Sequence, residues 1–248
     1  MMKTPPAERP AMPAPPAPGS TATGETAVED LARRRAGRPV GGVLDKSRIT
    51  RAALELVEKK GYDGLTMAAL ARALNVAPSA LYNHVKSKRD VLVLVEDHLA
   101  ALVDLSAFDA EPWEEAVRKW AWSYRDVFSR HTPLIPVIAV LPVTDAPQTL
   151  AMYETVSAGF RDAGFPEERI VSSIVALESF IFGSAYDVTA PADIFDPGSM
   201  AEATPSFTAA VRSLAEQGHE RPADVAFTLG LEALITGLGT LRNQVHQH

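Results

Sequence analysis

Few side chains in this 248-residue sequence have the type and spacing that catalysis requires. Glu178 and Asp187 lie in one apolar segment, but nine residues at about 100° each bring them out on opposite faces of a helix. Carboxylates so placed are poor partners for acid–base work. His98, His131 and His219 stand on separate segments without metal-ligand spacing, and the chain has no cysteine. No phosphate loop or nucleophile elbow is present either. We therefore expect no enzyme, no metal site and no cofactor.

Aromatic and aliphatic side chains in the second half of the chain suit a different task, the binding of an apolar ligand. Trp120, Tyr124 and Phe128 share one stripe of a predicted helix. Most such residues are ordinary core, but a stripe of this kind can also line a cavity in which a few polar groups orient a ligand. The candidate lining residues are Trp120, Tyr124, Phe128, Ile138, Leu141, Met152, Val156 and Phe182.

Positive charge is concentrated toward the N-terminal end, where it suits contact with nucleic acid. Residues 30–89 hold 13 Lys or Arg against 5 Asp or Glu, whereas residues 90–248 hold 9 against 23. A basic segment joined to an acidic body suits a protein that meets phosphates with one end only. The arm at residues 33–39 reads RRRAGRP, and we expect its Arg35 and Arg38 to contact phosphates or the minor groove.

Residues 66–88 predict the structural unit that would present such contacts, two short helices joined by a tight turn. Thr66 is a good N-cap, Asn75 tolerates the left-handed conformation that the turn needs, and Pro78 can open the second helix. The apolar residues of both helices face inward. Four residues are left on the outer face: Ser79, Ala80, Asn83 and His84.

Helices predicted on either side complete a three-helix unit. One runs from Asp45 to about Lys60 and places Arg48 where it could touch a phosphate. The other runs from Ser87 to about Asp104 and would link the unit to the body. Lys88 lies in its first turn, where a cation is unfavourable unless an anion such as a DNA phosphate is near. The pattern predicts a helix-turn-helix, with an ordinary helical hairpin as the alternative.

The remainder of the chain keeps a helical periodicity, so we predict an all-α fold. Two helices, at about 167–188 and 221–243, carry apolar residues on two sides and many small residues. Burial between a monomer core and a twofold partner explains this best, with a larger monomeric core as the alternative. The candidate dimer-interface residues are Ile174, Phe180, Gly230, Ala233 and Gly237.

The domain organisation that follows has three parts. Residues 1–40 form a Pro- and Ala-rich disordered leader with a basic arm, residues 41–90 a helix-turn-helix DNA-binding domain, and residues 91–248 a helical effector-binding and dimerisation domain. No apolar run approaches the length that a bilayer requires, and the N-terminus lacks the apolar core of a signal peptide. We therefore expect a cytoplasmic protein without a membrane partner.

With these residues laid out, the chain resembles the tetracycline-repressor (TetR) family of bacterial regulators. The likeness is carried by ALELVEKKGYDGLTMAALARALNVAPSALYNHVKSKRDVL at residues 53–92, and by PWEEAVRKWAWSYRDVF and LGLEALITGL in the body. It implies a homodimer that binds duplex DNA and a small-molecule effector. It also implies DNA contacts at Thr66, Pro78, Ser79, Ala80, Tyr82, Asn83, His84 and Lys88.

The resemblance also indicates where this chain departs from the tetracycline repressors. Ala68 stands where they place a base-reading Arg, so the operator should differ. Ile138 replaces the His that helps hold the magnesium–drug chelate, and Trp120 replaces a drug-binding Asn, whereas an acid is kept as Asp187. Loss of the ligating His argues against tetracycline and its metal, and for a more apolar effector.

We therefore predict a ligand-responsive transcriptional repressor, released from a palindromic operator by a small, largely apolar effector. Two alternatives remain. A helical ligand-binding protein or enzyme with a vestigial helix-turn-helix would not retard DNA and would turn over its ligand. A ligand-independent DNA-binding protein would show no thermal shift with any metabolite.

Overall fold

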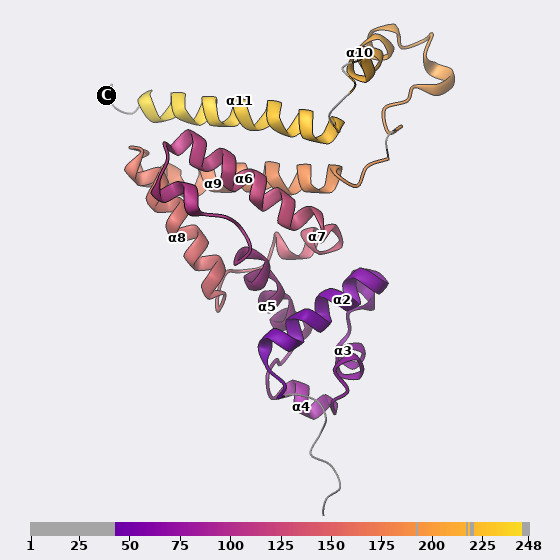
Figure 1. The fold of residues 1–248 in the computed structure, drawn as a ribbon, viewed down its shortest axis with the longest axis vertical. Coiled ribbons are helices and arrows are strands. Elements are labelled where there is room, and N and C mark those ends of the chain that lie inside the picture. The colour runs from indigo at the N-terminus through magenta and orange to yellow at the C-terminus, as the bar shows by residue number, and fades with distance from the viewer. Residues whose placement is uncertain (1–42, 192, 217, 219–220, 245–248) are drawn as a thin grey trace, which may run out of the picture. The chain divides into compact units, whose positions relative to one another are not determined.

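The computed structural model describes residues 43–191, 193–216, 218 and 221–244, which belong to one compact unit (Figure 1). Every regular element in these residues is a helix, as the all-α prediction requires. The leader predicted at residues 1–40 lies outside the described residues.

Three helices form the N-terminal unit: α2 (Lys46–Gly64), α3 (Met67–Leu74) and α4 (Pro78–Tyr82). Asp45 and Thr66 cap α2 and α3, because their side chains accept hydrogen bonds from the amides of Arg48 and Ala69 at 2.8 and 3.1 Å. Asn75 ends α3 with a φ of 54°, the left-handed conformation that the turn was predicted to need. These caps fix where α3 stops and where α4 starts.

A shared apolar core holds the three helices together. It contains Ile49, Ala53, Leu56, Leu70, Ala71, Leu74, Leu81 and Val85, all buried. The first helix was predicted to run to about Lys60, and the helical backbone is interrupted at the next residue, Gly61, after which α2 continues across a kink to Gly64. The kink is possible because Gly61 adopts a φ of 68°, which a residue with a Cβ would rarely tolerate.

Helices also make up the body: α6 (Trp113–Ser129), α7 (Ile135–Ile138), α8 (Pro147–Asp162), α9 (Glu167–Asp187), α10 (Pro205–Glu216) and α11 (Pro222–Gln244). Short 3-10 turns occur at η1 (Ser106–Asp109), η2 (Thr132–Leu134) and η3 (Gly198–Met200). Helix α6 packs against α9 and α11, which also pack against each other, and α8 packs against α9 (Figure 1). The pattern is that of a helical bundle around one apolar core.

Helix α5 (Lys88–Ala100) links the N-terminal unit to this bundle, since it packs against α2 as well as α6, α7 and α8. Ser87 caps it by accepting a hydrogen bond from the amide of Asp90 at 3.2 Å. Asp97 in turn caps α8, because its Oδ1 accepts hydrogen bonds from the amides of Gln148 and Thr149 at 2.6 and 3.1 Å. The helix ends at Ala100, earlier than expected.

A buried arginine joins three helices of the body. Arg125 on α6 is completely buried, and its Nε donates to Ser184 Oγ on α9 at 2.9 Å. Its Nη1 donates to Asp224 Oδ1 on α11 at 2.7 Å, and Trp122 and Phe227 pack against the guanidinium. A buried cation is costly unless it is paired in this way. The side chain therefore sets how α9 and α11 lie on α6.

Helices α9 and α11 correct one expectation from the sequence. Each is long and apolar enough, by length and composition alone, to cross a membrane, although no such segment was predicted. The apolar residues of both helices are interrupted by polar residues such as Ser, Thr and Glu, so neither helix contains one unbroken apolar run. Their mutual packing and their contacts with α6 account for part of that apolar surface. Val171, Val175 and Leu229 stay exposed in the single chain.

The burial of Arg125 predicts that its ion pair matters more than a similar pair nearby. Asp224→Asn should lower the free energy of unfolding by about 3 kcal/mol, because it leaves a buried cation without its partner. Glu232→Gln, which breaks the half-exposed pair between α11 and Arg118 on α6, should cost less than about 1 kcal/mol. Urea unfolding at one fixed protein concentration measures both. Equal losses would contradict this account.

Candidate functional site

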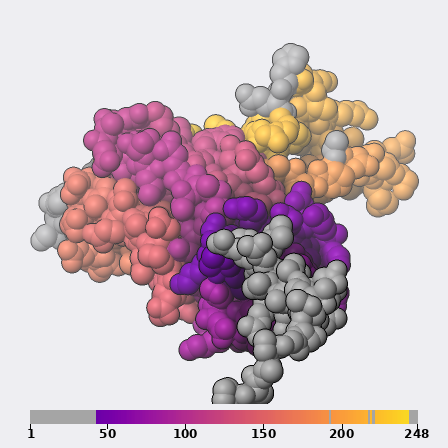
Figure 2. Space-filling view, turned by 60° about the horizontal axis from the view of Figure 1, so that its bottom comes forward, coloured from indigo at the N-terminus to yellow at the C-terminus, as the bar shows by residue number. Residues whose placement is uncertain are grey.

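The outer face of α4 presents the predicted DNA-contact residues to solvent. Ser79, Tyr82, Asn83 and His84 are exposed, as is Pro78 at the start of the helix, while Ala80 is half-buried. Leu81 and Val85 point the other way, into the core. The surface of α2 to α4 is visible in indigo and purple in Figure 2. A short helix with polar, sterically accessible residues on one side is the form that a groove-reading element takes.

Three other predicted contacts already have partners within the chain. Thr66 caps α3, and Arg48 Nη2 donates to the carbonyl of Leu74 at 3.0 Å. Lys88 Nζ donates to the carbonyl of Tyr62 at 3.2 Å and lies 3.5 Å from the centre of the Tyr62 ring. These contacts hold the side chains in place at the edge of the three-helix unit. Arg35 and Arg38 lie outside the described residues.

In the body, the aromatic stripe of α6 forms one cluster with α9. The ring centres of Trp120 and Tyr124 are 5.6 Å apart, and those of Tyr124 and Phe128 are 4.9 Å apart. Phe182 on α9 lies 5.5 Å from Tyr124 and 5.2 Å from Phe128. Four further candidates pack in the same apolar core: Ile138, Leu141, Met152 and Val156. The structure thus brings eight of the nine predicted ligand-binding residues into one core.

Asp187 is the ninth, and it lies apart from them. It is exposed at the end of α9 and lines a separate cavity of about 330 Å³ with Val188, Ile194, Phe195 and Pro222 among others. The helix periodicity explains the separation, because Asp187 follows the buried Ala185 by two residues and so turns away from the core.

A buried polar cluster lies at the centre of the same region, and the sequence did not predict it. Glu178 Oε1 on α9 accepts hydrogen bonds from the hydroxyls of Tyr124 on α6 and Tyr153 on α8, at 3.0 and 2.8 Å. Glu96 on α5 is the fourth member, since its charge acts on both tyrosines and the charge of Glu178 acts on it. The cluster therefore receives one residue from each of α5, α6, α8 and α9.

Burial dominates the ionisation of these four groups. It raises the pKa of Glu96 to about 7, with further contributions from the charges of Glu178 and Asp97. Burial also raises the pKa of Glu178, although the two tyrosine hydroxyls oppose this by bonding its carboxylate. The pKa of Tyr124 and that of Tyr153 are raised as well, first by burial and then by the neighbouring carboxylate, so both remain hydroxyl donors.

A signal for this cluster exists in the sequence. Glu178 lies on the apolar stripe of its helix, together with Ile174, Leu177 and Ile181. Glu96 likewise lies on the apolar stripe of α5, together with Leu92 and Leu99. A carboxylate within an apolar stripe is expected to be buried and therefore to be partnered or functional. Within its own helix, Glu178 has Asp187 as a candidate acid–base partner, and the two lie on opposite faces. Its partners come from other helices.

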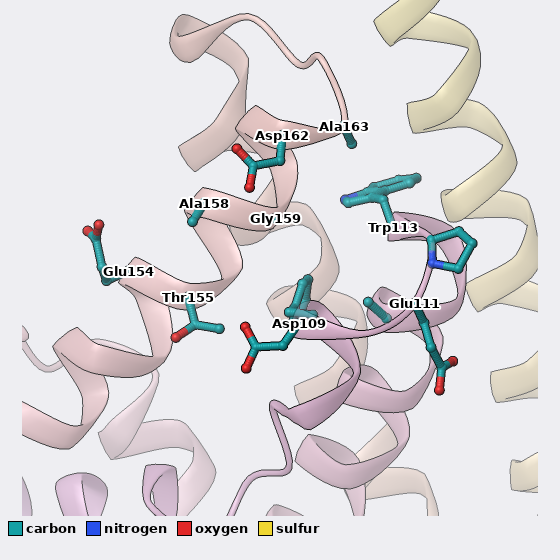
Figure 3. Close-up of a pocket in the computed structure, with 12 residues that line it drawn as sticks. Asp109, Glu111, Trp113, Glu154, Thr155, Ala158, Gly159, Asp162 and Ala163 are labelled. Carbon is teal, nitrogen blue, oxygen red and sulfur yellow. The ribbon is translucent and has the colours of Figure 1, made fainter.

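An open cavity of about 470 Å³ lies elsewhere, between η1, the start of α6 and α8 (Figure 3). Four carboxylates line it, those of Asp109, Glu111, Glu154 and Asp162, together with the indole of Trp113. None of the predicted ligand-binding residues lines this cavity. Lys119 already neutralises Glu111 at 2.5 Å, so part of this acidic lining is compensated within the chain.

The predicted dimer-interface residues divide into two groups. Ile174 is buried in the core of the single chain, and Phe180 stacks on Phe227 with ring centres 5.3 Å apart. A Cβ at Gly230 would come within 2.4 Å of the Phe180 ring, so this glycine serves close packing of α9 on α11. Ala233 and Gly237 are exposed, and a Cβ at Gly237 would meet open space. Of the five predicted residues, Ala233 and Gly237 are exposed in the single chain, Phe180 and Gly230 are half-buried, and Ile174 is buried.

Comparison with known proteins agrees with this architecture. Residues 49–95 match the family described as "Bacterial regulatory proteins, tetR family", and residues 107–242 match "Tetracyclin repressor-like, C-terminal domain". The chain is 29% identical over 142 residues to an HTH-type transcriptional regulator of Saccharopolyspora erythraea, an alignment that covers 57% of this chain and 60% of that protein. This chain thus spans about three fifths of that relative's length.

Two further relatives are covered almost completely. Tetracycline repressor protein class G of Vibrio anguillarum is 29% identical over 211 residues, which is 82% of this chain and 97% of the repressor. The crystal structure of the Streptomyces coelicolor TetR family protein ActR in complex with actinorhodin aligns with a TM-score of 0.65 and 27% identity, over 79% of this chain and 96% of ActR. Since the match at residues 107–242 alone spans more than half of the chain, this protein belongs to the TetR family of bacterial regulatory proteins.

Proposed function

We propose that this chain is a cytoplasmic, homodimeric transcriptional repressor that a small-molecule effector releases from a palindromic operator. The observation that carries the DNA-binding part is the outer face of α4. Its polar residues are exposed, whereas Leu81 and Val85 on the opposite side anchor the unit to its core. In a twofold dimer, two such helices enter successive major grooves of a palindrome.

Charge supports the same assignment. The excess of Lys and Arg at residues 30–89 provides the salt-dependent attraction to phosphates, and the acidic body is repelled from them. Lys88 is held against Tyr62 at the edge of the unit, where it can turn a donor toward a phosphate at little entropic cost. Base reading then falls to the short polar residues of α4.

The effector site that we propose is the aromatic region between α5, α6, α8 and α9. Ring faces of Trp120, Tyr124, Phe128 and Phe182 supply apolar contact there, and the Glu178 cluster supplies polar groups that can orient a ligand. ActR, whose body is similar, was solved with actinorhodin bound. Helix α5 reaches from this region to α2, so a ligand that shifts α5 changes the spacing of the two recognition helices.

For the dimer interface we propose the exposed faces of α9 and α11. Val171, Val175 and Leu229 are large apolar residues left uncovered in the single chain, and Ala233 and Gly237 lie on the same two helices. Small residues let helices of two protomers approach closely in a four-helix interface. Such an interface places the same surface patch of each subunit on the twofold axis.

Tyr82 tests the DNA-binding surface. Tyr82→Ala should weaken binding to a duplex, obtained by selection from a random library, by about tenfold, since the side chain is exposed on the outer face of α4. Phe207→Ala on α10 is the matched control, because both side chains are 48% exposed and its helix lies outside the three-helix unit. Gel retardation at one fixed salt concentration measures both. Unchanged affinity of the Tyr82 variant, with its fold intact by circular dichroism, would contradict the placement.

Gly237 tests the dimer interface. Gly237→Trp should halve the mass found by sedimentation equilibrium, because the new side chain points away from its own chain and into the proposed partner. Helix content should not change. Val140→Trp, at an exposed position outside α9 and α11, should remain dimeric. A dimeric Gly237 variant would rule out this part of the α11 surface as the interface.

A further inference from the structure

The polar cluster of the effector region holds two buried carboxylates that have no counter-charge. Glu96 and Glu178 are each only 8% exposed. Among the residues that the structure describes, no Lys, Arg or His forms an ion pair with either of them. Arg125, the nearest buried cation along α6 to Tyr124, is taken by Ser184 and Asp224. The negative charge of the cluster is therefore uncompensated within the described chain.

One oxygen of this cluster also lacks a hydrogen-bond donor. Glu96 Oε2 is fully buried without any partner in the described part of the chain. Glu178 receives its two hydroxyl donors on a single oxygen, Oε1. Buried polar atoms are partnered in nearly all proteins, and an orphaned carboxylate oxygen is among the costliest exceptions. The cluster can therefore accept a further donor, and a donor that is itself positive would also compensate the charge.

Aromatic side chains contact Glu178 and one another in this cluster. The hydroxyls of Tyr124 and Tyr153 reach Glu178 from two sides, and Trp120 packs against Tyr124 with ring centres 5.6 Å apart. The face of an aromatic ring attracts a cation, and most strongly where water is excluded. Two carboxylates and several aromatic rings, contributed by four helices, form a suitable environment for an organic cation.

We propose that the effector of this repressor carries a positively charged nitrogen on an apolar body, and that the nitrogen binds between Glu96 and Glu178 against the ring of Tyr124. The proposal rests on the effector site assigned above and specifies the chemistry of its ligand. It also explains how binding reaches the DNA-binding unit, because Glu96 belongs to α5. Charge neutralisation at Glu96 acts directly on the helix that packs against α2.

The open acidic cavity at Asp109, Glu154 and Asp162 is the competing location for a cation. Its carboxylates face an open cavity, where water screens charge, and Lys119 compensates one of its acids. A cation there would gain less than one between two buried carboxylates. We therefore place the cation site at the buried cluster, and a residue of the open cavity serves as the control in the experiment.

Three probes with one carbon skeleton test the proposal: 4-phenylbutylamine, 4-phenylbutanol and 4-phenylbutyrate. Calorimetric titration into the full-length protein should show the amine binding at least tenfold more tightly than the alcohol, with no binding of the carboxylate. Glu178→Gln and Glu96→Gln should each remove the preference for the amine. Glu154→Gln, on the same helix as Tyr153 but exposed and lining the open cavity, should keep it.

Several outcomes would overturn the cation site. These are equal binding of the amine and the alcohol, tighter binding of the carboxylate, no binding of the amine at ten millimolar, or loss of the preference only in Glu154→Gln. If the amine and the alcohol bound equally, the effector site proposed above would still be supported, because the alcohol would bind there without a charge. Failure of the protein to retard any duplex would remove the proposed repressor function without touching the cation site. The two proposals can thus fail separately.

The same titration has a pH dependence whose sign follows from Glu96. Burial and the charges of Glu178 and Asp97 raise its pKa to about 7, and ionisation is needed to bind a cation. When the pH is lowered from about 8 to about 6, Glu96 becomes protonated and the affinity for the amine should therefore fall. The amine itself stays protonated over this range. His131 interacts with Glu58, Arg130 and His98, and no histidine acts on Glu96, so Glu96→Gln should abolish the effect. A pH-independent affinity in the wild type would contradict the role of Glu96.

Discussion

Helix α5 is packed on both sides, by the N-terminal unit and by the body, and the rest of the structure depends on this constraint. The helix packs against α2 in the N-terminal unit and against α6, α7 and α8 in the body. Six of its thirteen residues are buried: Val91, Leu92, Val95, Glu96, Leu99 and Ala100. Close-packed interfaces do not deform continuously but change between discrete arrangements. A helix shared by two packed regions therefore cannot shift in one region without a response in the other.

Charge inside the body is handled in two contrasting ways. Arg125 is neutralised by the chain itself, through Asp224 and the rings of Trp122 and Phe227, and so fixes the packing of α6, α9 and α11. Glu96 and Glu178 receive hydroxyl groups and apolar surroundings but no cation from the described residues. The first arrangement is permanent and structural. In the proposed effector site, the ligand supplies the positive charge that the second arrangement lacks.

Local patterns predicted the helices well, because caps and periodicity act within a few residues of each other. Asp45, Thr66, Asn75 and Ser87 cap or end helices as expected. What was missed arises from contacts distant in sequence. Glu178 meets Tyr124 from 54 residues away, and no local pattern encodes that meeting. Ile174 and Phe180, predicted at a dimer interface, have neighbours within their own chain, and an apolar periodicity alone does not separate internal from external neighbours.

Asp97 couples α5 to α8 more rigidly than apolar packing alone would. Its carboxylate accepts from the first free amides of α8, a charge-assisted contact at a helix end. Apolar side chains can slide over one another at little cost, whereas these bonds lose strength steeply with distance and angle. Sliding of α5 along its own axis would stretch these bonds and is therefore opposed. The contact ties α5 to the first turn of α8.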